Sequence, residues 1–387
     1  MTIEQPDDIV YIGRFRPAHT AHIQTVERAC LLARKRVIIL VGSANQPRTT
    51  KNPWKWDEVS DMIYASLSDA AKQKVTILPL RDIIYNENKW NESVQEIVAS
   101  VVDEGDNVKL IGHSKDETSY YLNAFPQWGD PIEIENIEDL HATDIRNAMF
   151  KNEDFDSTIG RYLPKGIHDY IKSFMLTEEY EKLVEEYEFD VRHERMWDTD
   201  LMLDYFLEQE KRNPKWEGSW DVVEAVVNTL RGAYRVAPYK PTFNTTDAIV
   251  VKSGHVLLVR RKHAPGKGLY AIPGGYLNPS EWSLDGAIRE LKEETKIKEP
   301  PAVLKSNAKL NHVFEHPKRS IRGRIITRAY IIELPPSGPL PKVTAADDAK
   351  AAVWVPLSVF KKMEDQMFED HFHIINTMID KLSKENA

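Results

Sequence analysis

The chain has 387 residues, 42% of them hydrophobic, and a formal net charge of −9 at pH 7. This length suggests two or three domains, and the hydrophobic content is ordinary for a globular protein. The acidic balance disfavours a nucleic-acid partner, which needs a basic surface, and no apolar run is long enough to cross a bilayer.

Over the first 150 residues, short apolar runs alternate with helical patterns. We expect strands at 8–15, 36–43, 74–80, 107–114 and 131–135, and helices at 19–34, 56–70 and 91–103. This alternation predicts a parallel sheet with helices on both faces. In such sheets the ligand crevice lies at the carboxyl ends of the strands, where the segments GRFRPAH, GSANQPR, RDIIYNEN and GHSKDETS fall.

The pattern changes near Thr177. Residues 177–241 are charged and largely helical in periodicity, and we interpret them as a helical linker or insertion. They separate a first domain at 1–176 from a second domain at 242–387. In the second domain we expect strands at 247–253, 255–261, 324–334 and 351–357, with long helices at 280–295 and 359–381.

Two histidines stand where the first strand gives way to a helix. His19 and His22 are three positions apart, so both imidazoles would lie on one face of the first helical turn. A helix N-terminus favours phosphate, because its N–H groups are free and its dipole is positive there. The spacing alone leaves phosphate binding, a metal site and simple packing as alternatives.

The segment GRFRPAHTAH resembles the first signature of the nucleotidyltransferase superfamily, in which a strand ends in Gly-Arg-Phe and two histidines open the next helix. The family's second signature, Thr-x-x-Arg, has its counterpart in HATDIRNAM; Ala21 and His141 depart from the family pattern. The resemblance implies a Rossmann-like domain with His19, His22 and Arg146 as catalytic residues. It also implies an ATP site formed by Gly13, Arg14, Phe15, His19, His22, Gly112, His113, Lys115, Asp116, Thr143 and Arg146.

Further segments, PLRDIIYNENKW, GHSKDETSYYLNAFPQW and GSANQPRTTKNPW, resemble those of nicotinamide mononucleotide adenylyltransferases. In that family an aromatic residue stacks on the nicotinamide ring, and Trp90 occupies the matching position; a cationic pyridinium on an indole is favourable. The alternative is that Trp90 packs a helix onto the sheet. The resemblance implies a pyridine-nucleotide site formed by Ser43, Asn52, Trp54, Asp82, Tyr85, Asn86 and Trp90.

The resemblance covers residues 8–174. It implies transfer of AMP from ATP to nicotinamide mononucleotide, which gives NAD and pyrophosphate. Transfer to another phosphorylated acceptor is the alternative, because the histidine signature is shared across the superfamily. The sequence leaves open whether nicotinamide or nicotinate mononucleotide is preferred.

The segment GGYLNPSEWSLDGAIRELKEETKI carries a second cluster of charged residues. On a helix, an apolar stripe would face a sheet, and Glu290, Glu293 and Glu294 would cluster beside that stripe. Three carboxylates within about one turn repel one another unless a cation joins them, and their hard oxygens suit Mg²⁺ or Mn²⁺. A solvated acidic helix face is the ordinary alternative.

The spacing from Gly275 through Arg289 strongly resembles the Nudix box and implies an α/β/α Nudix domain. Lys296 departs from the family, which has glycine where the helix ends in a left-handed residue. The resemblance implies catalytic roles for Arg289 and Glu294, and support of the loop by Glu281. It implies metal binding by Gly274, Glu290, Glu293 and Glu294. Candidates for the general base are Glu315, Asp347 and Asp348, although each is more often an ordinary loop acid.

The flanking segments GKGLYAIPGGY and AADDAKAAVWVPL look most like those of ADP-ribose pyrophosphatases. The order of the two domains resembles a bifunctional family that joins the adenylyltransferase to such a hydrolase. The implied second reaction converts ADP-ribose to AMP and ribose 5-phosphate. A Nudix domain that senses ADP-ribose without hydrolysing it is the alternative, and three intact glutamates argue against it.

We expect the partners to be small nucleotides, namely ATP, nicotinamide mononucleotide, NAD and ADP-ribose, with no nucleic acid and no membrane. A homo-oligomer is compatible with the sequence. Cys30 is the single cysteine, which forbids an intrachain disulfide and fits a reducing compartment. The polar start MTIEQPDD is unlike a signal peptide, so we expect a cytoplasmic protein.

Overall fold

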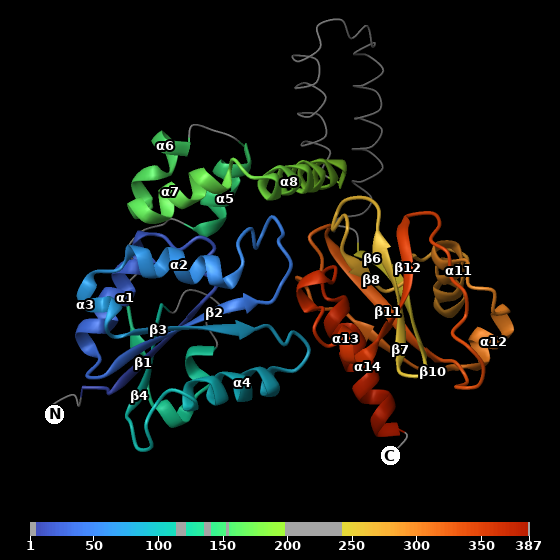
Figure 1. Ribbon diagram of the computed structural model, residues 1–387, viewed down its shortest axis with the longest axis horizontal. Helices are drawn as coiled ribbons and strands as arrows, with labels where there is room; N and C mark the ends of the chain where they lie inside the picture. The colour runs from blue at the N-terminus through green and yellow to red at the C-terminus, as the bar shows by residue number, and fades with distance from the viewer. Residues whose placement is uncertain (1–4, 114–120, 135–140, 152–154, 198–241, 386–387) are drawn as a thin grey trace, which may run out of the picture. The chain divides into compact units, whose positions relative to one another are not determined.

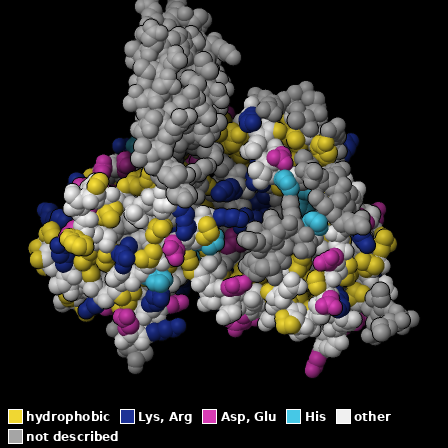
Figure 2. All heavy atoms as spheres, turned by 180° about the vertical axis from the view of Figure 1, so that it is seen from behind, with side chains coloured by type: hydrophobic (Ala, Val, Ile, Leu, Met, Phe, Trp, Pro, Cys, Tyr) yellow, Lys and Arg dark blue, Asp and Glu magenta, His cyan; other side chains and the backbone are white. Residues whose placement is uncertain are grey.

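The computed structural model describes residues 5–113, 121–134, 141–151, 155–197 and 242–385 (Figure 1). Contacts divide the chain into two compact units, Met1–Val184 and Glu185–Ala387. Within the described ranges, no helix is long and apolar enough to cross a membrane. On the face shown in Figure 2, acidic and basic side chains are interspersed among hydrophobic ones.

The first unit is built on five parallel strands in the order β3-β2-β1-β4-β5. The strands are β1 (Asp8–Gly13), β2 (Arg36–Ala44), β3 (Val75–Arg81), β4 (Val108–Gly112) and β5 (Ile132–Glu133). The predicted parallel sheet is therefore confirmed. The strand order changes direction between β1 and β4, and α/β sheets bind their ligands beside such a switch point.

Helices connect these strands and follow the last of them. They are α1 (Thr20–Leu32), α2 (Trp56–Ser66), α3 (Asp69–Lys72), α4 (Glu87–Ala99), α5 (Ala142–Lys151), α6 (Phe155–Thr158), α7 (Lys165–Phe174) and α8 (Glu178–Trp197). Short 3-10 turns occupy Pro126–Trp128 and Gly160–Tyr162. Figure 1 shows α2 and α4 on opposite faces of the sheet. The helical character expected for 177–241 is present as far as Trp197, and 198–241 lie outside the described residues.

Two predicted helices have different bounds in the structure. The helix expected at 56–70 is two helices, because Leu67 is extended and the Ser68 hydroxyl caps α3 by accepting from the N–H of Ala71 at 3.2 Å. The helix expected from Asn91 begins earlier, because the Asn86 side chain caps it by accepting from the N–H of Lys89 at 3.0 Å. Polar caps end or begin these helices where apolar periodicity gives no signal.

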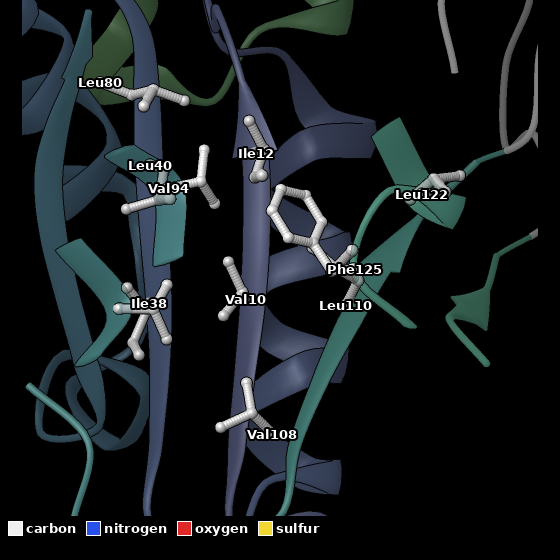
Figure 3. Close-up of a cluster of buried hydrophobic side chains, with 11 residues drawn as sticks. Val10, Ile12, Ile38, Leu40, Leu80, Val94, Val108, Leu110, Leu122 and Phe125 are labelled. Carbon is white, nitrogen blue, oxygen red and sulfur yellow. The ribbon is translucent and has the colours of Figure 1, made fainter. Parts of the chain in front are cut away.

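The core on one face of the first sheet lies between β1, β2 and α4. Successive residues of a strand point to opposite faces. On this face Val10, Ile12 and Leu40 form a buried cluster with Val94 of α4 (Figure 3). This packing holds the strands in register, so that their carboxyl ends lie together.

The second unit contains a mixed sheet of seven strands, with a main path of β10-β11-β6-β7-β12; β8 pairs with β7, and β9 pairs with β6. The strands are β6 (Thr242–Lys252), β7 (His255–Arg261), β8 (Tyr270–Ala271), β9 (Gly274–Tyr276), β10 (Ala308–Phe314), β11 (Arg324–Glu333) and β12 (Ala349–Pro356). Strands β6 and β11 run parallel, and the other pairs are antiparallel. The four predicted strands are present, and β8, β9 and β10 were not predicted.

The helices of this unit are α11 (Ser283–Thr295), α12 (Pro301–Ser306), α13 (Leu357–Phe360) and α14 (His371–Glu385), with a 3-10 turn at Glu364–Gln366. Ala287 and Leu291 of α11 pack against Ala248 and Leu257 of the sheet, and α14 contacts β10 and β11. Figure 1 shows α11 and α14 on opposite sides of the sheet, which confirms the predicted α/β/α arrangement. The single helix expected at 359–381 is wrong: α13 ends before Glu369, whose φ of 44° is left-handed, and α14 begins after it.

Candidate active sites

The first candidate site begins at the carboxyl end of β1. Gly13 ends the strand, and Phe15 follows with a left-handed φ of 52°. The Phe15 ring folds back over Gly13, so that a Cβ added at Gly13 would lie 2.6 Å from the ring. Glycine is therefore required beneath this ring. The sharp turn leaves Arg14 exposed and leads directly into α1.

His19 and His22 lie together at the start of α1. His19 is the N-cap residue, and Nδ1 of His22 accepts a hydrogen bond from the backbone N–H of His19 at 3.2 Å. The two ring centroids are 3.9 Å apart, and the His22 ring meets Phe15 edge-on at 5.2 Å. The spacing predicted two imidazoles side by side at a helix N-terminus, and the structure places them so. Their contact with phosphate stays a prediction.

Helix α5 brings Arg146 to the same turn. Its Nη1 donates to the carbonyl of Arg16 at 2.6 Å, and its Nη2 donates to the Thr143 hydroxyl at 3.0 Å. Burial, followed by the charge of Arg14, lowers the pKa of Arg146 to about 10. A cation that is buried and close to a like charge is stabilised by an anion. The two predicted signatures therefore meet, in an environment that favours phosphate.

Arg16 organises the strand ends, although the sequence analysis assigned it no role. Its side chain is only 3% exposed. It donates to the carbonyls of Gly42 at 2.6 Å, Ser43 at 3.2 Å and Trp54 at 3.0 Å. One guanidinium thus ties the turn after β1 to the end of β2 and to the loop that follows β2. Nothing in the sequence pattern indicates that Arg16 is buried whereas Arg14 is exposed.

The predicted pyridine-nucleotide residues Ser43, Asn52 and Trp54 lie at the end of β2 and in the tied loop that follows it. Ser43 is buried with a left-handed φ of 53°, and the backbone of Asn52 pairs with that of Thr49 at 3.1 Å. The Trp54 side chain is 1% exposed and packs on Phe174, with ring centroids 5.6 Å apart. Packing is therefore the observed role of the Trp54 indole, and the nucleotide contacts of these residues stay predictions.

The predicted residues after β3 lie at the start of α4. Asp82 and Tyr85 are half-buried in the loop, and Asn86 is the N-cap of the helix. Trp90 is half-buried against the core cluster, with its ring 6.4 Å from that of Phe125. The packing alternative for Trp90 is thus observed, and stacking on a pyridine ring stays a prediction.

The end of β4 supplies Gly112 and His113. A Cβ at Gly112 would lie 2.7 Å from the end of the Leu122 side chain, so a larger residue there would displace this buried leucine. Nδ1 of His113 donates to the carbonyl of Ile134 at 3.0 Å, which fixes the ring beside the strand end. Two other predicted ATP contacts, at 115 and 116, lie outside the described residues.

The second candidate site is centred on Arg289 of α11. Its guanidinium donates to Glu281 at 2.7 and 3.1 Å, to Glu290 at 2.7 Å and to Glu293 at 2.9 Å. These partners, Glu281 first, raise the pKa of Arg289. Glu281 also accepts from the N–H of Asn278 at 2.8 Å. Arg289 therefore orients two of the predicted metal-binding glutamates, and Glu281 connects it to the preceding loop.

Gly274 and Gly275 let the backbone of β9 pass between carboxylates. A Cβ at Gly275 would lie 2.7 Å from the Glu290 carboxylate, and one at Gly274 would lie 2.3 Å from Oδ1 of Asp247. The N–H of Gly274 donates to Glu294 at 3.1 Å. The paired glycines thus bring the predicted Gly274 ligand next to the acidic side chains, at a distance that no larger residue permits.

These carboxylates are held where ionisation is unfavourable. Burial raises the pKa of Glu294 to about 8 and that of Asp247 to about 6, and it also raises the pKa of Glu290. A cation beside such groups restores their charged forms. Hard carboxylate and carbonyl oxygens suit a divalent ion, and binding of Mg²⁺ or Mn²⁺ by Gly274, Glu290, Glu293 and Glu294 stays a prediction.

A pocket in the second unit opens beside Glu294, and several of its residues carried no sequence signal. Arg319 and Asp370 form a bidentate ion pair with both distances at 2.9 Å, and both are almost completely buried. Nδ1 of His371 accepts from the N–H of Ile272 at 2.9 Å, and burial lowers the pKa of His371 well below its usual value. These segments are distant in sequence, so no motif predicts their pairing.

Three adjacent side chains in this region, Glu369, Asp370 and His371, are close enough to hold a metal. Asp370 is bound by Arg319, Glu369 by Ser320 at 2.7 Å, and His371 by a backbone N–H. We therefore interpret them as structural. The three candidate general bases, Glu315, Asp347 and Asp348, are all exposed, and of these three Asp348 lines the pocket.

Known families match both halves of the chain. Residues 10–148 match the Cytidylyltransferase-like family, and residues 242–378 match the NUDIX domain. The nicotinamide/nicotinic acid mononucleotide adenylyltransferase of Acinetobacter baylyi is 37% identical over 182 residues, which are 47% of this chain and 93% of the relative. The ADP-ribose pyrophosphatase of Methanocaldococcus jannaschii is 32% identical over 117 residues, which are 30% of this chain and 63% of the relative.

A solved structure that covers nearly the whole chain matches both halves together. It is a bifunctional NMN adenylyltransferase/ADP ribose pyrophosphatase from Francisella tularensis, complexed with AMP and a Mn ion. The sequence identity is 31% and the TM-score is 0.82, and the match covers 97% of this chain and 99% of that chain. The resemblance inferred from the sequence is thereby confirmed, and this chain belongs to the family of bifunctional NMN adenylyltransferases/ADP-ribose pyrophosphatases.

Proposed function

We propose that this chain is a bifunctional enzyme of NAD metabolism. The first unit transfers AMP from ATP to nicotinamide mononucleotide, giving NAD and pyrophosphate. The second unit hydrolyses ADP-ribose to AMP and ribose 5-phosphate. The observation that supports both is the similarity, over 97% of the chain, to a Francisella protein named for these two activities. We place both reactions in the cytoplasm, a reducing compartment that fits a chain with one cysteine.

The transfer reaction depends on positioning and charge stabilisation. A phosphate oxygen of the mononucleotide bonds to the α-phosphorus of ATP while the bond to the pyrophosphate oxygen breaks. His19, His22 and Arg146 bind the ATP phosphates at the start of α1 and stabilise the negative charge that moves onto pyrophosphate. Arg16 holds the loop after β2 beside them through its bond to the Trp54 carbonyl, so that the acceptor phosphate approaches in line.

The hydrolysis reaction adds a water oxygen to one phosphorus of ADP-ribose and breaks that phosphorus's bond to the bridging oxygen. When bound at Gly274, Glu290, Glu293 and Glu294, Mg²⁺ or Mn²⁺ supplies charge stabilisation and lowers the pKa of water. Arg289 keeps Glu290 and Glu293 in place through direct hydrogen bonds. The intact carboxylate cluster favours a hydrolase over an ADP-ribose sensor.

Chromatography of the reaction products tests both activities. The full chain is incubated with Mg²⁺ or Mn²⁺ and ATP, together with nicotinamide or nicotinate mononucleotide, and separately with ADP-ribose. We expect a dinucleotide and pyrophosphate from the first incubation, and AMP from the second. Tight ADP-ribose binding without AMP would identify a sensor, and failure with both mononucleotides would exclude the proposed acceptor.

A further inference from the structure

The loop between β7 and β8, residues 262–269, contacts residues that line the hydrolase pocket. The carbonyl of Pro265 accepts from Nε of Arg261 at 2.7 Å, and Arg261 lines the pocket. Gly266 packs so closely on Phe368, another lining residue, that a Cβ there would lie 2.3 Å from the ring. The Arg261 guanidinium lies 4.2 Å from the centre of the same ring. The loop backbone therefore determines where Arg261 and Phe368 can lie.

A carboxylate from α8 holds this loop. The N–H of Gly266 donates to both oxygens of Glu186, at 2.8 and 2.9 Å, and the N–H of Lys267 donates at 3.2 Å. Glu186 belongs to the same compact unit as the pocket, yet it lies outside residues 242–378 that match the NUDIX domain. Its neighbour Glu185 makes a different contact, an ion pair with the exposed ammonium of Lys267 at 3.2 Å.

We propose that Glu186 is a positioning residue of the hydrolase pocket, acting through the loop backbone on Arg261. The charged carboxylate makes strong hydrogen bonds to two successive N–H groups and so limits the conformations of residues 265–267. The Pro265 carbonyl is then fixed where it orients Arg261 toward an anionic diphosphate beside Glu294. This role rests on the proposed hydrolysis of ADP-ribose.

Alanine substitution in the full chain tests this role against a matched neighbour. Glu186→Ala is expected to raise the KM for ADP-ribose about tenfold while kcat stays within about twofold. Glu186→Gln keeps one acceptor oxygen, so its KM for ADP-ribose should lie between that of the wild type and that of Glu186→Ala. Glu185→Ala should leave both constants unchanged, because it removes only a surface ion pair. The thermal unfolding of each preparation, followed by circular dichroism, reports whether the second unit is folded.

A double-mutant cycle with Arg261→Ala separates positioning from general stabilisation. If Glu186 acts through Arg261, Glu186→Ala has no further effect on KM in the Arg261→Ala background. The proposal would be overturned if Glu186→Ala raised the KM equally in the wild-type and Arg261→Ala backgrounds. It would also be overturned if Glu186→Ala had the same KM as Glu185→Ala.

Amide hydrogen exchange gives a readout that is independent of hydrolysis. Peptides covering 265–268 should exchange faster in Glu186→Ala than in the wild type, and unchanged exchange would also overturn the proposal. If the wild type makes no AMP, the hydrolase assignment fails. The exchange rates and the ADP-ribose dissociation constants of the same variants then still decide the role of Glu186.

Discussion

Trp90 packs on the core of the first unit and is also predicted to bind the mononucleotide. It lies half-buried against the core cluster near Phe125. Trp90→Ala is expected to raise the KM for the mononucleotide much more than the KM for ATP, because it removes the surface on which a cationic pyridinium would stack. It should also lower the melting temperature, because part of the indole packs on the core.

Initial rates measured while each substrate is varied in turn check this prediction. Trp90→Phe is the control, because it keeps an aromatic face with a smaller loss of packing. Equal rises of the two KM values in Trp90→Ala would mean that Trp90 only supports the fold.

In the second site, Glu294 links metal binding to pH. Burial raises its pKa to about 8, so below that pH the carboxyl is mostly protonated and must release a proton before it can bind a cation. Mn²⁺ affinity is therefore expected to increase by roughly tenfold or more between about pH 6 and pH 8, and to level off above that. The raised pKa of Glu290 acts in the same direction.

Titration of the metal-free protein with Mn²⁺ at several pH values measures this dependence. Glu294→Gln should bind the ion weakly at every pH and show a shallower dependence, because the titrating group is gone. An affinity in the wild type that does not change with pH would contradict the assignment of Glu294 as a ligand.

Among the structural elements, α11 ends with a strained residue. Lys296 has a left-handed conformation, with φ 50° and ψ 28°. A side chain with a Cβ costs about 1 kcal/mol there relative to glycine. Lys296→Gly is therefore expected to raise the free energy of unfolding of the second unit by about 1 kcal/mol. ADP-ribose hydrolysis should not change, because the Arg289 network stays intact.

Denaturant unfolding compares this variant with Lys298→Gly. Lys298 is also exposed but does not have a positive φ, so glycine there only adds flexibility and should destabilise slightly. If Lys296→Gly proves no more stable than Lys298→Gly, the left-handed conformation is not a source of strain.

The helices and strands that could be predicted from the sequence are those in which the buried face shows as a regular spacing of apolar residues. In α11, the helical spacing predicted that Leu291 faces the sheet, and Leu291 packs there in the buried cluster. Strand β10 was missed although its exposed residues Lys309 and Asn311 alternate with less exposed ones, because these polar residues mask the apolar run.

Contacts between distant segments explain the remaining differences. The break in the helical pattern before α14 coincides with the pairing of Asp370 and Arg319. The role of Arg16 follows from its hydrogen bonds to carbonyls of β2 and of the following loop. Side chains that bond to backbone far away in sequence leave no local periodicity. Motif spacing could therefore predict Glu281 and Arg289, whose partners lie in the same motif, but not Arg16 or Arg319, whose partners are far away in sequence.

At the scale of the whole molecule, each set of site residues falls within one compact unit. His19 and Arg146 belong to the first unit, and Arg289 and Glu294 belong to the second. Changes without shared partners usually have independent effects. The central claim is therefore that two separate reactions are carried by one chain, each dependent on its own residues.

Assay of both reactions on the same preparations of wild type, His19→Ala and Glu294→Gln tests that claim most directly. Asp285→Asn, a change at a partly exposed acid in the first turn of α11 that pairs with Lys305, is the matched control for Glu294→Gln. We predict that His19→Ala loses roughly a hundredfold or more of NAD formation and keeps AMP release from ADP-ribose, and that Glu294→Gln does the reverse. Loss of both activities in either variant, or of neither, would contradict the account.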